Sequence, residues 1–169
     1  PERRLEALRI DYASDERDVR RQLDAYIRSR EGGSDGRRAV DHFVHQLLRK
    51  RLASSPAAFA ATLERHIATI EGNAPNERSQ KKFDERILRR AIAKTEEGYA
   101  DDNQRDAAES EAIEEAGKHS RPPSELERGM LDSLRSWAQQ SARRTDAKAT
   151  ALLGWLAEHL RDGHQWTNE

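Results

Sequence analysis

Residues 47–66, which read LLRKRLASSPAAFAATLERH, decide the expected fold. Apolar residues recur at helical spacing on both sides of the Ser55-Pro56 pair. Serine is favoured at a helix N-cap, and proline at the first helical position, where its missing N–H loses no partner. The stretch therefore predicts the end of one helix, a short turn and the start of a second. Because so short a connection folds the chain back, we expect an antiparallel helical hairpin over Leu47–Ile70.

The rest of the chain predicts further helices that each carry one apolar stripe. Ser14, Ser124 and Asp146 are the expected N-caps of three of them. The residues expected to face the core are Val19, Leu23, Tyr26, Ile27, Val40, Phe43, Val44, Leu47, Leu48, Leu52, Phe59, Leu63, Ile67, Ile70, Leu126, Met130, Leu131, Leu134, Trp137, Ala138, Leu152, Leu153, Leu156 and Leu160. Leu8, Ile10 and Tyr12 alternate, which fits either a short strand or an extended lead-in to the first helix.

The expected fold is therefore all-α: an irregular bundle of five to seven helices around the hairpin, with at most one short N-terminal strand. Along the chain we expect a lead-in at residues 1–13, the hairpin core at 14–72 and a variable charged insertion at 73–123. Closing helices at 124–162 and a tail at 163–169 follow.

The insertion carries two opposite charge blocks. Residues 78–94 hold seven basic and two acidic residues, whereas residues 96–115 hold nine acidic residues and one basic residue. The acidic block has only Ala107, Ala108, Ala112 and Ile113 as an apolar stripe. We therefore expect a weak or mobile helix there, with a solvated acidic face. Neither block has an assigned role.

The composition excludes several classes of function. Hydrophobic residues make up 35% and charged residues 36% of the chain, and the net charge is −1, so any basic surface must be local. The chain has no cysteine, which excludes disulfides, thiolate zinc sites and cysteine nucleophiles, and fits a reducing compartment. No apolar run approaches the ~20 residues of a membrane span. We expect a cytoplasmic protein with no membrane partner.

Catalytic motifs are absent from the sequence. It contains no phosphate-binding GxxxxGK[ST] or GxGxxG pattern and no GxSxG nucleophile motif. His42 and His45 lie three residues apart on one expected helix, and Asp41 or His66 would complete a metal site. The competing and favoured interpretation is that these histidines are ordinary helix-surface or interface residues, with no metal ligand among them.

Arg49, Lys50 and Arg51 form a local basic cluster, here called the basic triplet. With Arg37 and Arg38 it could meet a phosphate backbone, although no aromatic stacking platform accompanies it. The alternative is that these side chains only solvate a helix face.

The stretch at residues 47–66 resembles a segment of bacterial superfamily-two helicase-like ATPases of the Swi/Snf type. That family includes proteins resembling the RNA-polymerase-recycling translocase and the DISARM-type defence translocase. Residues 1–12, PERRLEALRIDY, resemble the segment that leaves the first RecA-like motor lobe. Residues 145–156, TDAKATALLGWL, resemble the helix that precedes the second lobe. The order and spacing of the three segments also fit the region between the lobes.

The resemblance implies an excised helical module that couples motor-lobe movement to DNA. The nucleotide-binding motifs of the family lie in the lobes and are absent here, so this chain alone would have no catalytic residue and no cofactor. ATP and magnesium belong to the longer parent chain, a DNA-dependent ATPase. The expected partners are the flanking motor lobes and, through Arg49, Lys50 and Arg51, duplex DNA or a lobe. Asp146 and Lys148 would anchor the last helix to the second lobe.

Two other classes of function compete with this hypothesis. The first is a stand-alone helical module that binds other proteins through the Leu47–Ile70 hairpin. The second, which rests on His42, His45 and His66 alone, is a metal-dependent hydrolase built on a helical bundle.

Overall fold

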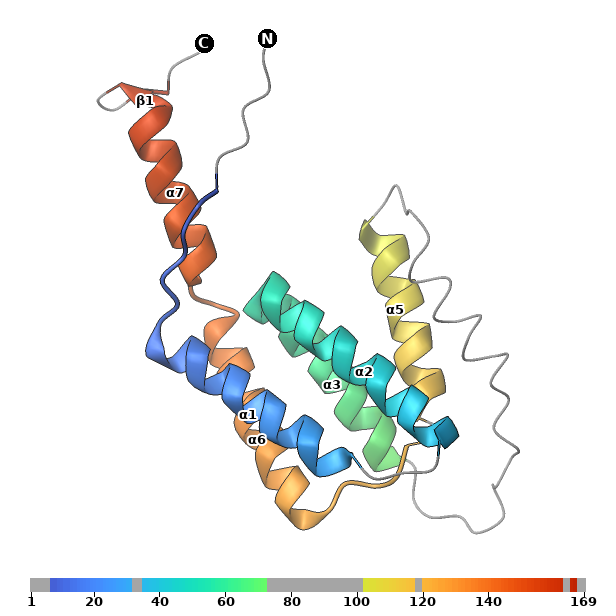
Figure 1. The fold of residues 1–169 in the computed structure, drawn as a ribbon. Coiled ribbons are helices and arrows are strands. Elements are labelled where there is room, and N and C mark those ends of the chain that lie inside the picture. Colours follow the sequence, from blue (N-terminus) through green and yellow to red (C-terminus); the bar gives the residue numbers. More distant parts are fainter. Residues whose placement is uncertain (1–6, 32–34, 73–101, 118–119, 163–164, 167–169) are drawn as a thin grey trace.

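The computed structural model describes residues 7–31, 35–72, 102–117, 120–162 and 165–166, and the side chains of most but not all of them. Apart from two short strands near the end of the chain, these residues form an all-helical bundle, as predicted (Figure 1). The helices are α1 (Ser14–Arg30), α2 (Asp35–Ser54), α3 (Pro56–Gly72), α5 (Asp102–Gly117), α6 (Glu125–Ser141) and α7 (Ala147–His159).

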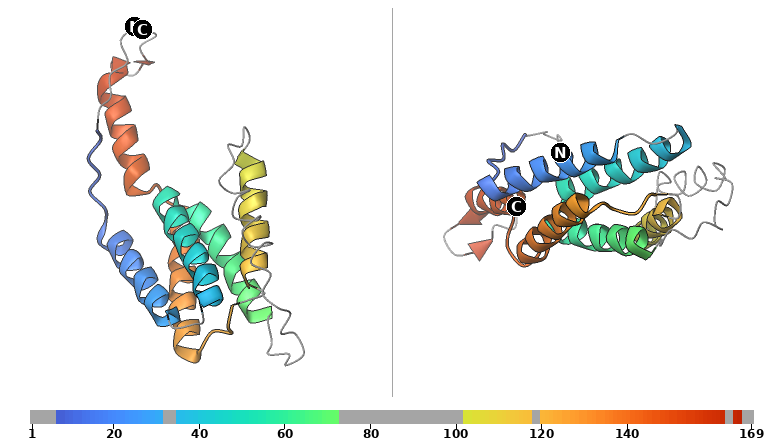
Figure 2. Two further views of the ribbon diagram at one scale, coloured as in Figure 1. Left: turned by 45° about the vertical axis from the view of Figure 1, so that its right-hand side comes forward. Right: turned by 90° about the horizontal axis from the view of Figure 1, so that it is seen from below.

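The predicted antiparallel hairpin is formed by α2 and α3 (Figure 1). The Ser55 hydroxyl accepts a hydrogen bond from the Ala58 N–H at 3.1 Å, and Pro56 is the first residue of α3. Both features confirm the capping turn expected from the sequence. The antiparallel pair α1 and α6 lies on one side of the hairpin and α5 on the other (Figure 2).

The core lies between α1, α2, α3 and α6. Of the residues expected to face it, most are buried in these four helices: Val19, Leu23, Tyr26, Ile27, Val40, Val44, Leu47, Leu48, Phe59, Leu63, Ile67, Ile70, Leu131, Leu134 and Ala138. Phe43, Leu52, Met130 and Trp137 are partly buried against them. Leu126 is an exception, because it is 68% exposed.

The start of the chain corrects one expectation and decides between two alternatives that the sequence left open. The N-cap of α1 is Ala13 and not Ser14, and the carboxylate of Glu16 accepts a hydrogen bond from the Ala13 N–H at 2.9 Å. Residues 7–13 form no strand, so the alternating pattern there marks an extended lead-in. A pair of two-residue strands lies instead beyond α7, where β1 (Arg161–Asp162) pairs antiparallel with β2 (Gln165–Trp166).

The acidic segment is a helix that packs on one side, while Asp106, Glu111 and Glu114 on it are exposed as expected. In α5 the residues Ala108, Ala112, Ile113 and Ala116 are buried against the hairpin. Gly117 at the end of α5 comes so close to α3 that an added Cβ would lie 2.0 Å from Cγ2 of Thr69. The small side chains that made this helix look weak are therefore what allows its close approach to α3. The basic block at residues 78–94 lies outside the described residues.

The last helix is less buried than the sequence predicted. Helix α7 projects from the bundle and has no buried residue (Figures 1 and 2). Leu152, Leu153 and Leu160 are 49%, 57% and 37% exposed. The stripe that was expected to close the core is therefore open to solvent in this structure.

Candidate interaction surfaces

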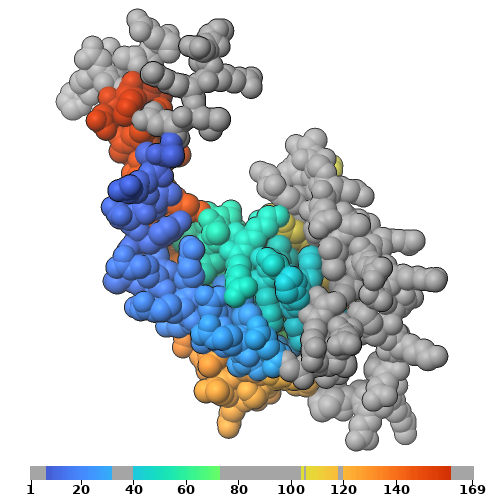
Figure 3. Space-filling model, viewed as in Figure 1, coloured from blue at the N-terminus to red at the C-terminus, as the bar shows by residue number. Residues whose placement is uncertain are grey.

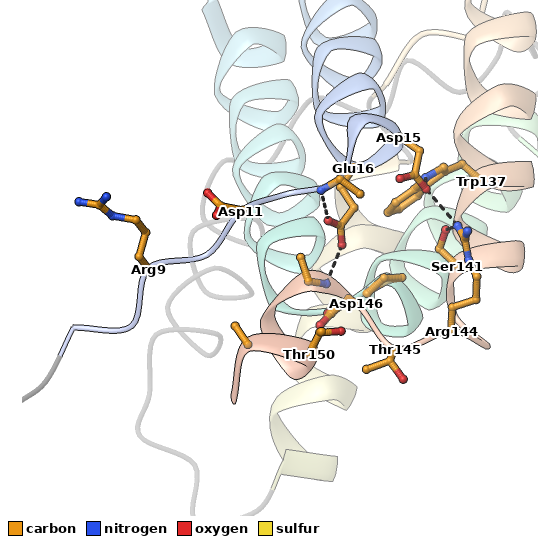
Figure 4. Close-up of a pocket in the computed structure, with 14 residues that line it drawn as sticks. Arg9, Asp11, Asp15, Glu16, Trp137, Ser141, Arg144, Thr145, Asp146 and Thr150 are labelled. Carbon is orange, nitrogen blue, oxygen red and sulfur yellow. Dashed lines mark hydrogen bonds and ion pairs between the residues drawn. The ribbon is translucent and has the colours of Figure 1, made fainter. Parts of the chain in front are cut away.

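An open cleft of about 480 Å³ lies where α7 leaves the bundle (Figure 4). Its walls come from the lead-in, the first turn of α1, the end of α6 and the first turns of α7. Arg9 and Asp11 lie on the lead-in side, whereas Thr145 and Thr150 lie on the α7 side (Figure 4). We call this region the α7 joint.

Glu16 links the two helices that meet at the joint. One of its carboxylate oxygens accepts the Ala13 N–H at 2.9 Å, and the other accepts the Ala147 N–H at 3.0 Å (Figure 4). Each N–H lies at the start of a helix, where backbone donors have no partner within the helix. A single carboxylate therefore caps α1 and α7 together and fixes the starts of the two helices relative to each other.

Asp15 ties the same region to α6. Its Oδ2 atom accepts hydrogen bonds from the Trp137 indole N–H at 3.2 Å and from Arg144 at 3.0 Å. Burial acts to raise the pKa of Asp15, but these two hydrogen bonds outweigh it and hold the pKa below its ordinary value. The carboxylates of Asp15 and Glu16 are therefore used to hold helices together.

The residues expected to anchor the last helix both act at the joint. Asp146 is the N-cap of α7, as predicted, and its carboxylate accepts the Ala149 N–H at 2.7 Å. The Lys148 ammonium donates to the carbonyl oxygens of Ala53 and Ser54 at the end of α2. A cation is favourable there, because the last carbonyls of a helix lack partners and carry its negative dipole end. Lys148 thus anchors α7 to the end of α2, whereas Asp146 caps α7 itself.

The basic triplet faces carboxylates of the same chain. Arg49 donates to Asp24 of α1 at 2.8 Å, and Lys50 donates to Glu109 of α5 at 3.3 Å. Arg51 donates to Glu109 through Nε at 2.6 Å and also pairs with Asp106. Within the described residues each cation of the triplet therefore has at least one acidic partner, and two of the three partners lie in α5.

Burial differs among these ion pairs. The side chain of Arg51 is 14% exposed and that of Glu109 is 3% exposed, whereas Arg49 and Lys50 are 50% and 61% exposed. Burial acts to lower the pKa of Arg51, but its hydrogen bonds and charge interactions with Asp106 and Glu109 raise it overall. The pairing with α5 is therefore centred on Arg51. The acidic block was recognisable in the sequence, but nothing in its local pattern indicated this partner.

A second groove, of about 580 Å³, lies between α1 and α2 and brings Arg20 to the same surface as Arg49 and Lys50. Asp24 also lines it. The two helices form neighbouring parts of the face shown in Figure 3. Arg20 was not among the residues predicted from the sequence, because only the tertiary fold places α1 beside the triplet.

The three histidines of the metal hypothesis have different surroundings. His42 is exposed, while His45 and His66 are buried beside Tyr26. The Tyr26 hydroxyl and Nε2 of His66 form a hydrogen bond of 2.6 Å. Among the described residues no three metal-ligating side chains converge. Burial, with the nearby Arg30 charge, lowers the pKa of His45 to about 4 and that of His66 to about 3.

A buried charge cluster lies near these histidines. Arg30 and Glu127 are almost fully buried and their charged groups lie 3.8 Å apart, while Arg121 donates to Glu127 at 2.6 Å. Burial acts to raise the pKa of Glu127, but hydrogen bonds from Arg121 and Ser124 lower it to about 2. The Arg30 Nη2 donates to the Arg121 carbonyl at 2.9 Å. The cluster joins α1 to the segment that enters α6.

The charged side chains of the joint have structural partners within the chain. At the joint, the carboxylates of Asp15, Glu16 and Asp146 are each hydrogen-bonded to N–H groups that fix helix positions. Within the part of the chain that the structure describes, no helix has both the length and the apolar character needed to cross a bilayer.

Comparisons of this chain with protein-family models, with curated proteins and with solved structures found no match.

Proposed function

We propose that this chain is a non-catalytic helical module that docks onto another protein domain through α7. We further propose that the module belongs to an ATP-dependent DNA translocase, where it joins two RecA-like motor lobes and couples their movement to DNA. ATP and magnesium would bind to the lobes. The observation that carries the proposal is the exposed leucine stripe of α7 on a helix whose base is firmly held.

The exposed stripe is unusual for its position. Leu152, Leu153 and Leu160 have exposed fractions of 49%, 57% and 37%, and beyond its first turn α7 packs against no other described helix. Covering apolar surface stabilises an interface by roughly 25 cal/mol per Å². A contiguous apolar face that the protein itself leaves uncovered is a feature of docking surfaces.

The base of α7 is built to transmit movement. Glu16 caps α1 and α7 with one carboxylate, and Lys148 holds the first turn of α7 to the end of α2. Force applied along α7 would therefore reach both α1 and the hairpin. A helix attached by a loose linker would lack this property.

The arrangement of the chain also supports the translocase assignment. The lead-in and α7 are the segments that resemble the lobe exit and the lobe entry of helicase-like ATPases. They are far apart in sequence, yet both line the joint and run beside each other away from the bundle (Figure 1). This geometry suits a module inserted between two adjacent lobes, because the chain can enter and leave on the same side.

The alternative is a stand-alone helical module that binds other proteins. The hairpin first expected to supply its surface is unsuited to this role, because the apolar faces of α2 and α3 form the core. The alternative would therefore use α7 as well, and the two proposals differ in what α7 contacts.

The test uses the complete protein that the gene encodes. The translocase proposal requires motor-lobe sequence on both sides of the module, and a gene without it would leave only the alternative.

In the complete protein, Leu152→Ala with Leu153→Ala should lower DNA-stimulated ATP hydrolysis at least about fivefold and spare basal hydrolysis, because the nucleotide site is untouched. Leu126→Ala is the matched control, since Leu126 is also highly exposed but lies on α6. Unchanged stimulation, or an equal loss in the control, would reject docking through α7.

A further inference from the structure

We propose that the basic triplet is part of a polyanion-binding surface that α5 occupies at Lys50 and Arg51, and that a nucleic-acid backbone binds all of it only when α5 is displaced. The inference rests on the proposed function, because it assigns the nucleic-acid surface of that module and its regulation. In this arrangement the acidic helix is an intramolecular substitute for phosphate groups.

The contacts between α5 and the triplet carry the argument. Glu109 accepts hydrogen bonds from both Lys50 and Arg51, at 3.3 Å and 2.6 Å, and Asp106 pairs with Arg51. Two carboxylates one helical turn apart thus meet two neighbouring cations. Arginine binds the planar oxygens of a carboxylate and those of a phosphate with the same fork of N–H groups. The donors that hold α5 are therefore the donors that a phosphodiester would use.

Helix α5 is the bundle helix whose apolar attachment is smallest. Its buried apolar residues are three alanines and one isoleucine, whereas α3 buries Phe59, Leu63, Ile67 and Ile70. Because apolar stabilisation scales with buried area, α5 is held by much less of it than α3 is. Ion pairs therefore contribute a larger part of the interactions that hold α5 than of those that hold α3. A competing anion would weaken these ion pairs.

The chain that follows α5 keeps one hydrogen bond to it, from the Ser120 N–H to the Gly117 carbonyl at 3.1 Å, and has further contacts with α1 and α2. The Ser120 hydroxyl donates to Asp41 at 3.3 Å, and Arg121 donates to Glu127 and to the Ser29 carbonyl. These contacts hold the entry to α6 against α1 and α2. Displacement of α5 would therefore leave the four-helix core and the surface of the triplet in place.

The surface next to the α5 contact suits an extended anion. The groove between α1 and α2 adds Arg20 beside Arg49 and Lys50, so basic side chains continue from the α5 side of α2 across to α1. Asp24 is the acidic residue in that groove, and it pairs with Arg49. The partner that fits is a nucleic-acid backbone with several successive phosphates.

The first test measures the affinity of the 169-residue chain for a duplex DNA of about 20 base pairs by fluorescence anisotropy at low salt. Asp106→Asn with Glu109→Gln removes the two competing charges and should tighten binding at least about fivefold, because the open state becomes more populated. The matched control is Glu111→Gln with Glu114→Gln, which removes two charges from exposed positions of the same helix.

Two results of this test would overturn the proposal. One is equal affinity in the wild type and the Asp106–Glu109 variant, or an equal gain in the control. The other is a gain that persists when Arg49, Lys50 and Arg51 are all replaced by alanine. A gain that depends on the triplet and falls steeply with salt supports it. The α7 variants should leave this affinity unchanged, so failure here is distinct from failure of α7 docking.

The second test needs no substitution and so avoids any folding defect. Hydrogen–deuterium exchange of the wild-type chain should show faster exchange of α5 amides when the duplex DNA is added, whereas α3 amides should remain protected. Unchanged or slower exchange in α5 at saturating DNA would show that the helix stays in place, and this would overturn the displacement proposal.

Discussion

Helices α3 and α7 have similar sequence patterns and opposite environments. Both begin at a capping residue, and both carry large apolar residues at helical spacing. Yet α3 contacts α2, α5 and α6 and buries Phe59, Leu63, Ile67 and Ile70, whereas α7 buries no residue at all. An apolar stripe shows that a helix has a face to cover. It does not show whether the cover is the protein's own core or a partner.

The first prediction compares a buried side chain of α3 with an exposed side chain of α7. Phe59→Ala in α3 should lower the free energy of unfolding by ~3–5 kcal/mol, because it removes a fully buried ring and leaves a cavity. Leu152→Ala in α7 should change it by less than about 0.5 kcal/mol, because the side chain is half exposed. Urea denaturation measures both. Similar losses of stability in the two variants would contradict the difference in burial between α3 and α7.

The next effect concerns the buried charge cluster. Glu127→Gln should cost about 3 kcal/mol, because it leaves the buried Arg30 and the partly buried Arg121 without their carboxylate. Glu125→Gln is the matched control, since Glu125 is exposed in the first turn of the same helix. Chemical denaturation at neutral pH compares the two. A loss no larger than that of the control would mean that the cluster is energetically neutral.

The buried histidines predict a fall in stability on acidification. Their folded pKa values, about 4 for His45 and about 3 for His66, lie below the ordinary 6.5. Between pH 6.5 and 4.5 the unfolded chain therefore binds more protons than the folded one, and stability falls as pH falls. For each histidine the slope is up to roughly 1.4 kcal/mol per pH unit.

This pH window separates the histidines from Glu127, whose ordinary pKa is 4.5 and whose folded pKa is about 2. The stability that Glu127 contributes is lost only below pH 4.5. Urea titrations at several pH values between 6.5 and 4.5 should give a shallower slope for His66→Phe than for the wild type. His42→Phe, at an exposed position, is the control substitution. Equal slopes for the wild type and His66→Phe would contradict the prediction.

The smallest expected effect tests the approach of α5 to α3. Gly117→Ala should destabilise the chain by about 1–2 kcal/mol, because the added Cβ would meet Thr69 at 2.0 Å. Gly129→Ala in α6 should stabilise it by about 0.5–1 kcal/mol, because nothing lies within 4 Å and alanine favours a helix. Thermal melts measure both. Thr69→Ser should partly rescue Gly117→Ala if the contact with the Thr69 methyl group is responsible.

Local chemistry made several features predictable from the sequence. The helical periodicity of residues 47–66, the Ser55-Pro56 turn and the caps at Ser124 and Asp146 depend on residues within one helical turn, so the sequence determined them. The core positions of α1, α2 and α3 were predictable for the same reason, because a helix with a single wide apolar stripe buries that stripe. The N-cap of α1 was misplaced by one residue, since the acceptor there is Glu16 from inside the helix.

Which helix faces pack together depends on the tertiary fold. The basic triplet and its α5 partners are 55 to 59 residues apart, and no local pattern specifies such a pairing. The alanine stripe of α5 predicted a weak helix on its own, but small side chains become an advantage when a neighbour such as α3 can approach closely. The exposure of α7 was decided in the same way. Periodicity sets which residues share a face, whereas burial depends on what the rest of the chain places against that face.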